Sequence, residues 1–141
     1  MITIGIDPGL SGACAVLDHN GLRVVFDLPT MQIPNVGTVA LVQRKVDGLA
    51  LAGLLRQHIP PGEPVTAAVE AVSAMGGKNN SIQTQGSLMR TLGAIEAVLE
   101  CFRYPVVYAY PQIWKKFYGL IDPNAKDSQR KGASLVKARA L

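Results

Sequence analysis

The sequence has little cysteine and no long apolar run. Its two cysteines, Cys14 and Cys101, lack CxxC spacing, so we expect buried, inert thiols rather than a disulfide framework or a zinc knuckle. No apolar stretch reaches the roughly 18 to 20 residues that a bilayer span needs. Residues 1–7 lack the basic region and cleavage site of a signal peptide. These absences predict a cytoplasmic protein with no membrane partner.

Histidine is equally scarce, because only His19 and His58 occur. Both lie beside turn-forming residues, so we expect solvated loop side chains without a catalytic role. Charged residues make up only 17% of the chain, but they are unevenly distributed. Residues 1–70 carry 4 basic and 6 acidic groups, whereas residues 71–141 carry 10 basic and 4 acidic groups. A basic half suggests a polyanionic partner, although a solvated basic surface has the same composition.

The sequence is rich in hydrophobic residues, which occur in short runs. Hydrophobic residues make up 48% of 141 residues, without repeats or low-complexity tracts, so we expect one domain spanning residues 1–141. Apolar runs at 2–6, 12–17 and 22–28 are separated by tight turns, which predicts an antiparallel meander. Residues 29–46 show no clean period and predict an irregular connection with a short strand near 39–42.

The remainder predicts helices alternating with strands. Asp47 is a suitable N-cap for a helix over 48–58, and a buried strand over 65–69 ends at Glu70. The later elements are a loop over 73–83, a helix over 84–102, a strand over 105–109, a helix from Pro111 to Gly119, and a last helix from about 125 onwards. This order indicates an α/β fold with a mixed sheet flanked by helices.

Two carboxylates stand where this fold places functional groups. Asp7 and Glu70 each end a buried strand. Each alone is an ordinary turn or strand-end residue, but adjacent parallel strands would bring both to one sheet edge, where ligands of open α/β sheets bind. Hard oxygen ligands suit Mg²⁺ or Mn²⁺. Asp18 and Asp27 are better interpreted as caps of the meander turns.

Three segments together resemble a known family: Ile4-Gly5-Ile6-Asp7-Pro8-Gly9-Leu10-Ser11-Gly12, Val69-Glu70, and Tyr110-Pro111-Gln112-Ile113-Trp114-Lys115-Lys116. In their order, the chain resembles the RuvC-like Holliday junction resolvases, especially phage-type members. The resemblance implies an RNase H-like fold with a mixed five-stranded sheet, in which an antiparallel meander joins parallel strands and helices flank the sheet.

The activity implied is that of a magnesium-dependent endodeoxyribonuclease of the crossover junction type. It would act as a homodimer on branched DNA, in a bacterial cell or a phage-infected host, without a small-molecule cofactor. Two metal ions per complete site, Mg²⁺ or Mn²⁺, would carry out phosphodiester hydrolysis.

The resemblance also assigns residues. Asp7 matches the first catalytic aspartate, which bridges the metal ions, and Glu70 matches the catalytic glutamate. Lys126 matches a lysine that contacts DNA. The segment over 73–85 corresponds to one that meets the junction, which makes Lys78, Asn79 and Gln83 candidate DNA contacts. Lys115 and Lys116 are candidate phosphate ligands, with a solvated helix face as the alternative.

The chain departs from the family pattern in two places. The family completes its metal site with further acids on a final helix, and Asp122 and Asp127 lie too early to match them. Since residues 137–141 resemble the middle of a helix, we expect a truncated chain that is nearly inactive as written. Where classical resolvases carry an aromatic wedge, this chain has Ser73 and Met75, so junction specificity is less secure than nuclease chemistry.

Three other functions are compatible with parts of the pattern. An actin-like or sugar-kinase ATPase also begins with a strand, Asp and Gly, but needs a second lobe and another phosphate loop. A RuvC-like nuclease that processes structured RNA is a closer alternative. A protein that binds branched DNA without cutting it is the non-enzymatic alternative.

Overall fold

The structure is a computed structural model that describes residues 1–34, 37, 40, 42–72, 82–121, 133, 136 and 137. Contacts divide the chain into two units, Met1–Tyr108 and Ala109–Leu141. A single domain over the whole chain stays a prediction. In the part of the chain that the structure describes, no helix has both the length and the apolarity to cross a membrane.

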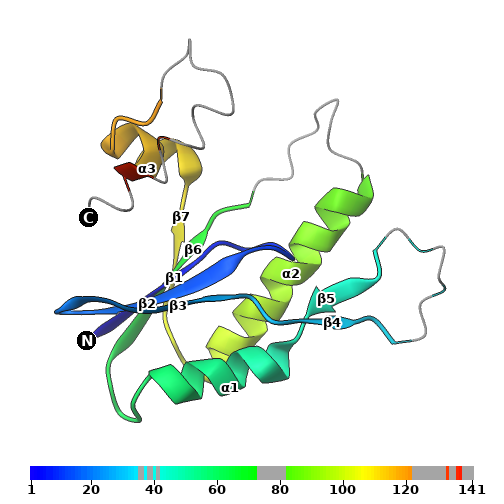
Figure 1. Ribbon diagram of the computed structural model, residues 1–141, viewed down its shortest axis with the longest axis horizontal. Helices are drawn as coiled ribbons and strands as arrows, with labels where there is room; N and C mark the ends of the chain where they lie inside the picture. The colour runs from blue at the N-terminus through cyan, green and yellow to red at the C-terminus, as the bar shows by residue number, and fades with distance from the viewer. Residues whose placement is uncertain are drawn as a thin grey trace. The chain divides into compact units, whose positions relative to one another are not determined.

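A five-stranded sheet organises the first unit (Figure 1). The predicted meander is confirmed as β1 (Ile2–Ile6), β2 (Ala13–Asp18) and β3 (Gly21–Asp27), whose neighbouring strands run antiparallel. β6 (Val65–Glu70) lies parallel to β1 on its other side, and β7 (Val106–Ala109) follows, giving the order β3-β2-β1-β6-β7. The predicted mixed five-stranded sheet is therefore confirmed.

Strand alternation decides which side of this sheet is buried. Ile2, Ile4 and Ile6 of β1 are buried, as are Val65, Ala67 and Val69 of β6. Because successive side chains of a strand point to opposite faces, these residues share one face. They belong to the same core as Leu51 and Leu55 of α1 (Gly48–His58) and Ile95 and Leu99 of α2 (Ile82–Cys101). The apolar core therefore lies on one face of the central strands.

Helix α1 begins and ends where the sequence predicts. Asp47 is its N-cap, with Oδ1 accepting a 3.0 Å hydrogen bond from the Ala50 backbone N–H. Such a bond satisfies one of the amide groups that the first helical turn leaves without a partner. His58, predicted to be a solvated loop residue, instead lies in the last turn of α1, half-buried, with its ring stacked 5.8 Å from that of Phe26.

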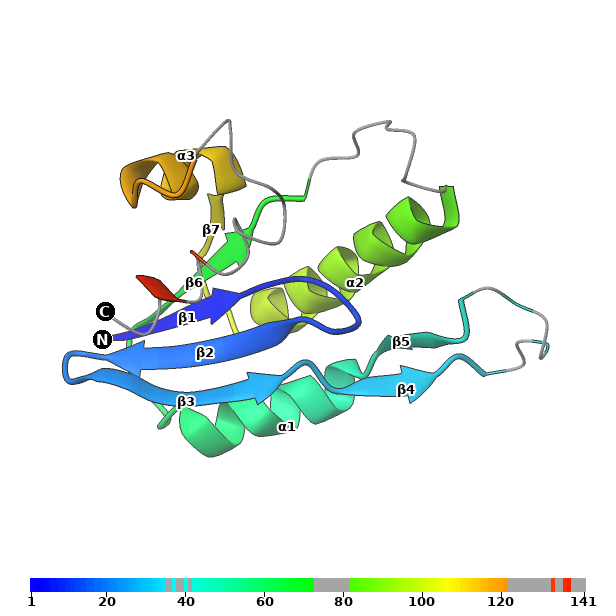
Figure 2. The ribbon, with the colours of Figure 1, turned by 45° about the horizontal axis from the view of Figure 1, so that its top comes forward.

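The prediction for residues 29–46 needs correction, because they contain a second, two-stranded sheet. β4 (Thr30–Gln32) pairs antiparallel with β5 (Arg44–Val46), and Arg44 donates to the Thr30 hydroxyl and carbonyl oxygens at 2.7 to 3.0 Å. Figure 2 shows β4 continuing from β3. Of the strand expected near 39–42, residues 40 and 42 are outside any strand, and 39 and 41 lie outside the described residues. Strands of three residues are too short to give a period in the sequence.

Helix α2 begins at Ile82, within the segment predicted as a loop, and residues 73–81 lie outside the described part. Its buried residues, Thr91, Ile95 and Leu99, follow the four-residue spacing of one helix face. Cys101 lies off that face and is exposed, so its predicted burial is wrong. Cys14 is buried as predicted.

The second unit contains α3 (Pro111–Phe117), with Pro111 in its first turn as predicted. A proline suits this position because the first-turn N–H groups have no partner within a helix. Gly119, at φ 66°, lies in the turn that follows. Residues 133, 136 and 137 are helical, and the rest of the helix expected from about 125 onwards lies outside the described residues.

Candidate functional site

The parallel pairing of β1 with β6 brings the two predicted carboxylates to the same sheet edge. Ile6 pairs with Val69 in the register of these strands. Asp7 and Glu70 each follow those paired residues by one position. Neighbouring strands are about 4.8 Å apart, so the register places the two acids side by side. Both Ile6 and Val69 are buried, and alternation turns the acids away from the apolar core.

Asp7 and Glu70 line one cavity of about 250 Å³. We call it the carboxylate cavity; its other lining residues are Pro8, Ala71, Val72 and Leu88. Asp7 is exposed and Glu70 is half-buried. The carboxylates thus meet solvent at a concave site with apolar walls, where a ligand can reach both.

The turn after Asp7 is fixed by a backbone contact. A Cβ atom at Gly12 would lie 2.0 Å from the carbonyl oxygen of Asp7. The Asp7 N–H donates to the Ala13 carbonyl at 3.0 Å, and the Gly12 N–H donates to the Gly9 carbonyl at 3.1 Å. Only glycine permits so close an approach, so this turn depends on Gly12 for the position of Asp7.

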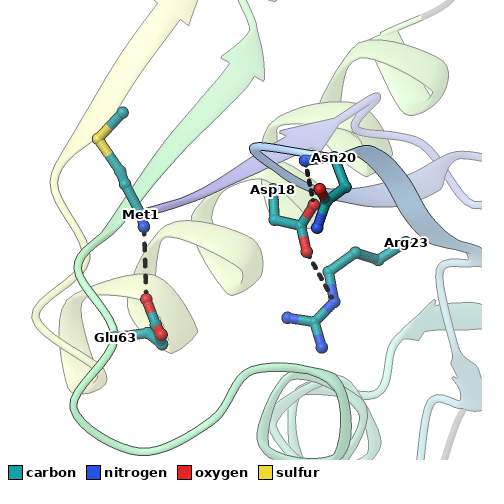
Figure 3. A network of polar contacts seen from close by, with 5 residues as sticks. All are labelled: Met1, Asp18, Asn20, Arg23 and Glu63. Carbon is teal, nitrogen blue, oxygen red and sulfur yellow. Dashed lines mark hydrogen bonds and ion pairs between the residues drawn. The ribbon is translucent and has the colours of Figure 1, made fainter.

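Asp18 has a structural role instead, as predicted for a turn cap (Figure 3). Its Oδ1 accepts from the Asn20 backbone N–H at 2.7 Å, and its Oδ2 lies 3.5 Å from Nε of Arg23. These contacts fix the turn between β2 and β3. Asp27 is exposed at the end of β3, and the capping role expected for it stays a prediction.

The residues of the carboxylate cavity fit a hard divalent cation. Two carboxylates provide the oxygen ligands that Mg²⁺ and Mn²⁺ prefer. Burial raises the pKa of the Cys14 thiol to about 12, which keeps it protonated and unsuited to metal binding. Within the described ranges, no group of three or more His, Cys, Asp or Glu side chains is arranged to hold a metal. Among the described residues, the carboxylate cavity therefore offers two carboxylates as possible ligands.

A second hollow adjoins the first. We call it the polar groove; it measures about 470 Å³ and shares Leu88 with the carboxylate cavity. Gly9 and Leu10 of the turn after β1 line one side, and Val42 also contributes. The rest comes from α2, through Gln83, Thr84, Ser87, Leu88 and Thr91. All of these described lining side chains are uncharged.

Of the predicted DNA contacts that the structure describes, only Gln83 lines a hollow near the carboxylates. Gln83 is exposed in the first turn of α2 and lines the polar groove. Lys115 and Lys116 lie in the last turn of α3, in the second unit, and Nζ of Lys115 is 5.2 Å from the Trp114 ring centroid. Lys78, Asn79 and Lys126 lie outside the described residues.

The sequence prediction missed the contribution of α2 to this region. Gln83, Ser87 and Thr91 are spaced four residues apart, so they follow one helix face. This polar stripe was a detectable pattern, but the prediction placed residues 73–83 in a loop and started the helix later. The Gly12 contact with Asp7 had no comparable pattern, because it depends on the conformation of the turn.

Comparison with solved structures identifies the fold. No protein-family model matches the chain, and no curated protein matches its sequence. The structure of Thermus thermophilus RuvC in complex with a Holliday junction substrate matches with a TM-score of 0.53 and 16% identity, over 82% of this chain and 68% of that one. A second Thermus thermophilus RuvC structure has a TM-score of 0.49 and 19% identity, over 91% of this chain and 74% of that one. The first of these matches shows that the chain has a RuvC-like fold.

Proposed function

We propose that the protein is a divalent-metal-dependent endonuclease that cuts branched DNA, with Asp7 and Glu70 as catalytic residues. The observation that carries the proposal is the placement of these two carboxylates in one cavity at the ends of parallel strands. The RuvC-like fold supports branched DNA as the substrate, since one structural neighbour is a RuvC bound to a Holliday junction.

The proposed reaction is hydrolysis of a phosphodiester bond. Water oxygen forms a new bond to phosphorus, the bond from phosphorus to one deoxyribose oxygen breaks, and that oxygen takes up a proton. Divalent ions held at the carboxylates would supply an activated water and charge stabilisation for the leaving oxygen. Asp7 and Glu70 would hold the metal at the cavity, Asp7 as the shared ligand that the family resemblance implies and Glu70 as a further ligand.

Apart from the metal, the chain contributes a fixed backbone position for Asp7 and apolar walls around the carboxylates. Gly12 and the Asp7–Ala13 hydrogen bond fix the backbone of Asp7, so its carboxylate is attached at a preorganised position for binding metal. Pro8, Val72 and Leu88 provide apolar walls beside the solvent-accessible carboxylates, and such low-dielectric surroundings strengthen nearby electrostatic interactions. Two protein ligands suit weak metal binding, and we propose that the described residues form part of a larger ligand set.

The substrate also suggests an assembly. Resolution of a four-way junction requires two cuts in symmetry-related strands, and a homodimer presents two copies of one site related by a two-fold axis. We propose such a dimer on the junction, with Lys78, Asn79, Lys115, Lys116 and Lys126 as further DNA contacts. Sedimentation of the protein with and without junction DNA tests the stoichiometry, and one chain per junction would contradict it.

Cleavage of a synthetic four-way junction in Mg²⁺ tests the function. We expect weak, metal-dependent cleavage by the wild type and at least about a hundredfold less by Asp7→Asn and Glu70→Gln, because each removes a ligand charge. Asp27→Asn is the matched control, as it makes the same chemical change at an exposed position on another strand. Equal cleavage by all four proteins would contradict the assignment of the site.

The same assay separates the alternatives. In one outcome, the protein binds junctions tightly in Mg²⁺ and Mn²⁺ but never cuts them, and Asp7→Asn binds them as the wild type does. The protein would then be a branched-DNA-binding protein without nuclease activity. Preferential cutting of structured RNA over the four-way junction would instead identify an RNA-processing nuclease. Either result would overturn the proposed substrate or activity.

A further inference from the structure

The polar groove differs chemically from the carboxylate cavity beside it. The cavity has two acids, whereas the described lining of the groove consists of amide, hydroxyl, glycine and aliphatic groups. Phosphates are bound by basic side chains, by helix N-termini and also by Ser, Thr and Gln side chains, while bases are recognised by hydrogen-bonding groups together with apolar contacts. The described lining of the groove has no basic side chain, and Leu10, Val42 and Leu88 add the apolar surface that a base requires and a phosphate does not. The groove is therefore suited to a base and its sugar rather than to a phosphate.

The position of the groove relates its occupant to the proposed reaction. Leu88 lines both hollows, and the segment Asp7–Leu10 passes from one to the other, with Asp7 and Pro8 in the cavity and Gly9 and Leu10 in the groove. A strand whose phosphate lies at the carboxylates would place a neighbouring nucleoside at the groove. At a branch point such a nucleoside is less constrained by stacking than within a continuous duplex.

The groove provides directional contacts as well as space. Gln83 has an amide that both donates and accepts, and this group can form a bidentate pair with an adenine edge. Ser87, one turn along α2 and half-buried, provides a hydroxyl. Thr91, 2% exposed, closes the far end of this stripe, and Leu10 and Leu88 provide apolar surface. At about 470 Å³, the groove falls within the range of small-molecule sites.

We propose that the polar groove binds an unstacked nucleoside next to the cleaved phosphate, and that Gln83 and Ser87 determine the base preference. This inference rests on the proposed nuclease site, because the carboxylates define which phosphate is adjacent. It adds a substrate position and two specificity-determining residues to that function.

Junctions carrying 2-aminopurine at each position beside the branch point test the proposal without requiring cleavage. This base becomes more fluorescent when it leaves the stack. We expect a severalfold rise in emission at one position when the wild type binds in Ca²⁺. We expect the rise to be lost in Ser87→Leu, whose larger side chain fills the groove. No rise at any position, or a full rise with Ser87→Leu, would overturn the proposal.

Base preference provides the second readout. We expect wild-type binding or cutting to favour one base at the responding position by about five- to a hundredfold, the range of a good bidentate contact. Gln83→Ala should remove most of that preference without lowering junction affinity by more than a fewfold. Gln57→Ala is the matched control, because Gln57 is exposed on α1 and is absent from the groove lining. Equal preference in Gln83→Ala and the wild type would contradict the assignment.

The two proposals fail in different ways. In one outcome, Asp7→Asn loses cleavage, but Gln83→Ala and Ser87→Leu change neither the fluorescence nor the base preference. The proposed nuclease site would then stand, and the proposed nucleoside site in the polar groove would be overturned. The opposite outcome is a fluorescence response at one base together with metal binding and cleavage that Asp7→Asn does not change. That outcome would overturn the proposed nuclease site, and with it the adjacency on which this inference rests. Thermal unfolding of each variant verifies that the domain remains folded in these comparisons.

Discussion

The α-carbon of Gly12 packs against the main chain of Asp7, and any Cβ at position 12 would lie 2.0 Å from the Asp7 carbonyl oxygen. The neighbour is backbone, so a side-chain rotation cannot relieve the clash. We expect Gly12→Ala to lower the free energy of unfolding by about 2 to 3 kcal/mol, in the upper range of overpacking, and to weaken metal binding at the carboxylate cavity. Urea denaturation measures the first effect.

Gly53→Ala is the control for that substitution. Gly53 lies exposed within α1, and a Cβ there would meet nothing within 4 Å. Alanine is favoured over glycine in a helix by about 0.5 to 1 kcal/mol, so this variant should be more stable than the wild type. If Gly12→Ala were as stable as Gly53→Ala, the turn would not fix Asp7 as described.

Arg103, two residues after the end of α2, adopts a left-handed conformation with φ 58°. The Tyr104 N–H donates to the Leu99 carbonyl and the Arg103 N–H to the Glu100 carbonyl, at 3.0 and 2.9 Å, as in a Schellman motif. This conformation costs a non-glycine residue about 1 to 2 kcal/mol, and the greater freedom of unfolded glycine offsets part of that. Arg103→Gly should therefore stabilise the protein by about 0.5 to 1 kcal/mol in urea denaturation, whereas Arg103→Ala should not. Equal stability of both variants would contradict the motif.

The two cysteines should differ sharply in reactivity. Burial raises the pKa of Cys14 to about 12 from an ordinary 9.0, while Cys101 is exposed. A thiol-disulfide reagent at pH 8 should label Cys101 quickly and Cys14 only on unfolding, because the reagent needs an accessible thiol and the thiolate is the reactive form. Cys101→Ser should abolish the fast reaction, and fast labelling of Cys14 in that variant would contradict its burial.

The Cys14 pKa also predicts a pH dependence of stability. Because the folded-state pKa is raised, folding favours the protonated thiol, and this contribution is fully present below pH 9. It is lost as pH rises from about 9 to about 12, where the unfolded chain ionises and the folded chain does not. Cys14→Ala should remove that part of the alkaline loss of stability, as measured by urea denaturation across this pH window.

Lysines on α3 should affect DNA affinity rather than base preference. If Lys115 and Lys116 contact phosphates, the double substitution to alanine should weaken junction binding for all sequences alike. It should also reduce the slope of log affinity against log salt by about 1 to 2. Fluorescence anisotropy over a salt series measures both quantities. An unchanged slope would assign these lysines to a solvated helix face.

The sequence was sufficient for elements whose pattern is local. The meander, the parallel strand before Glu70 and helix α1 with its Asp47 cap all match the prediction, because alternation, turn residues and capping act over a few positions. The pairing of Asp7 with Glu70 followed from one further rule, that parallel strands share an edge for their carboxyl ends.

The parts that the sequence did not reveal depend on contacts between distant segments. β4 and β5 are three-residue strands joined by the Arg44–Thr30 hydrogen bonds, and too short to show alternation. Cys101 is exposed because it follows Leu99 off the buried helix face, which apolar composition alone does not reveal. The polar groove combines a turn, Val42 and one face of α2, and only the fold brings these together.

Titration of the protein with Mn²⁺, followed by the loss of the paramagnetic resonance signal of the free ion, tests the metal site most directly. The wild type should bind Mn²⁺ with a dissociation constant on the order of millimolar, as expected for a site with few ligand charges. Asp7→Asn and Glu70→Gln should each weaken that binding by about tenfold or more, whereas Asp27→Asn should leave it unchanged. Equal Mn²⁺ affinity in all four proteins would contradict the assignment of Asp7 and Glu70 as metal ligands.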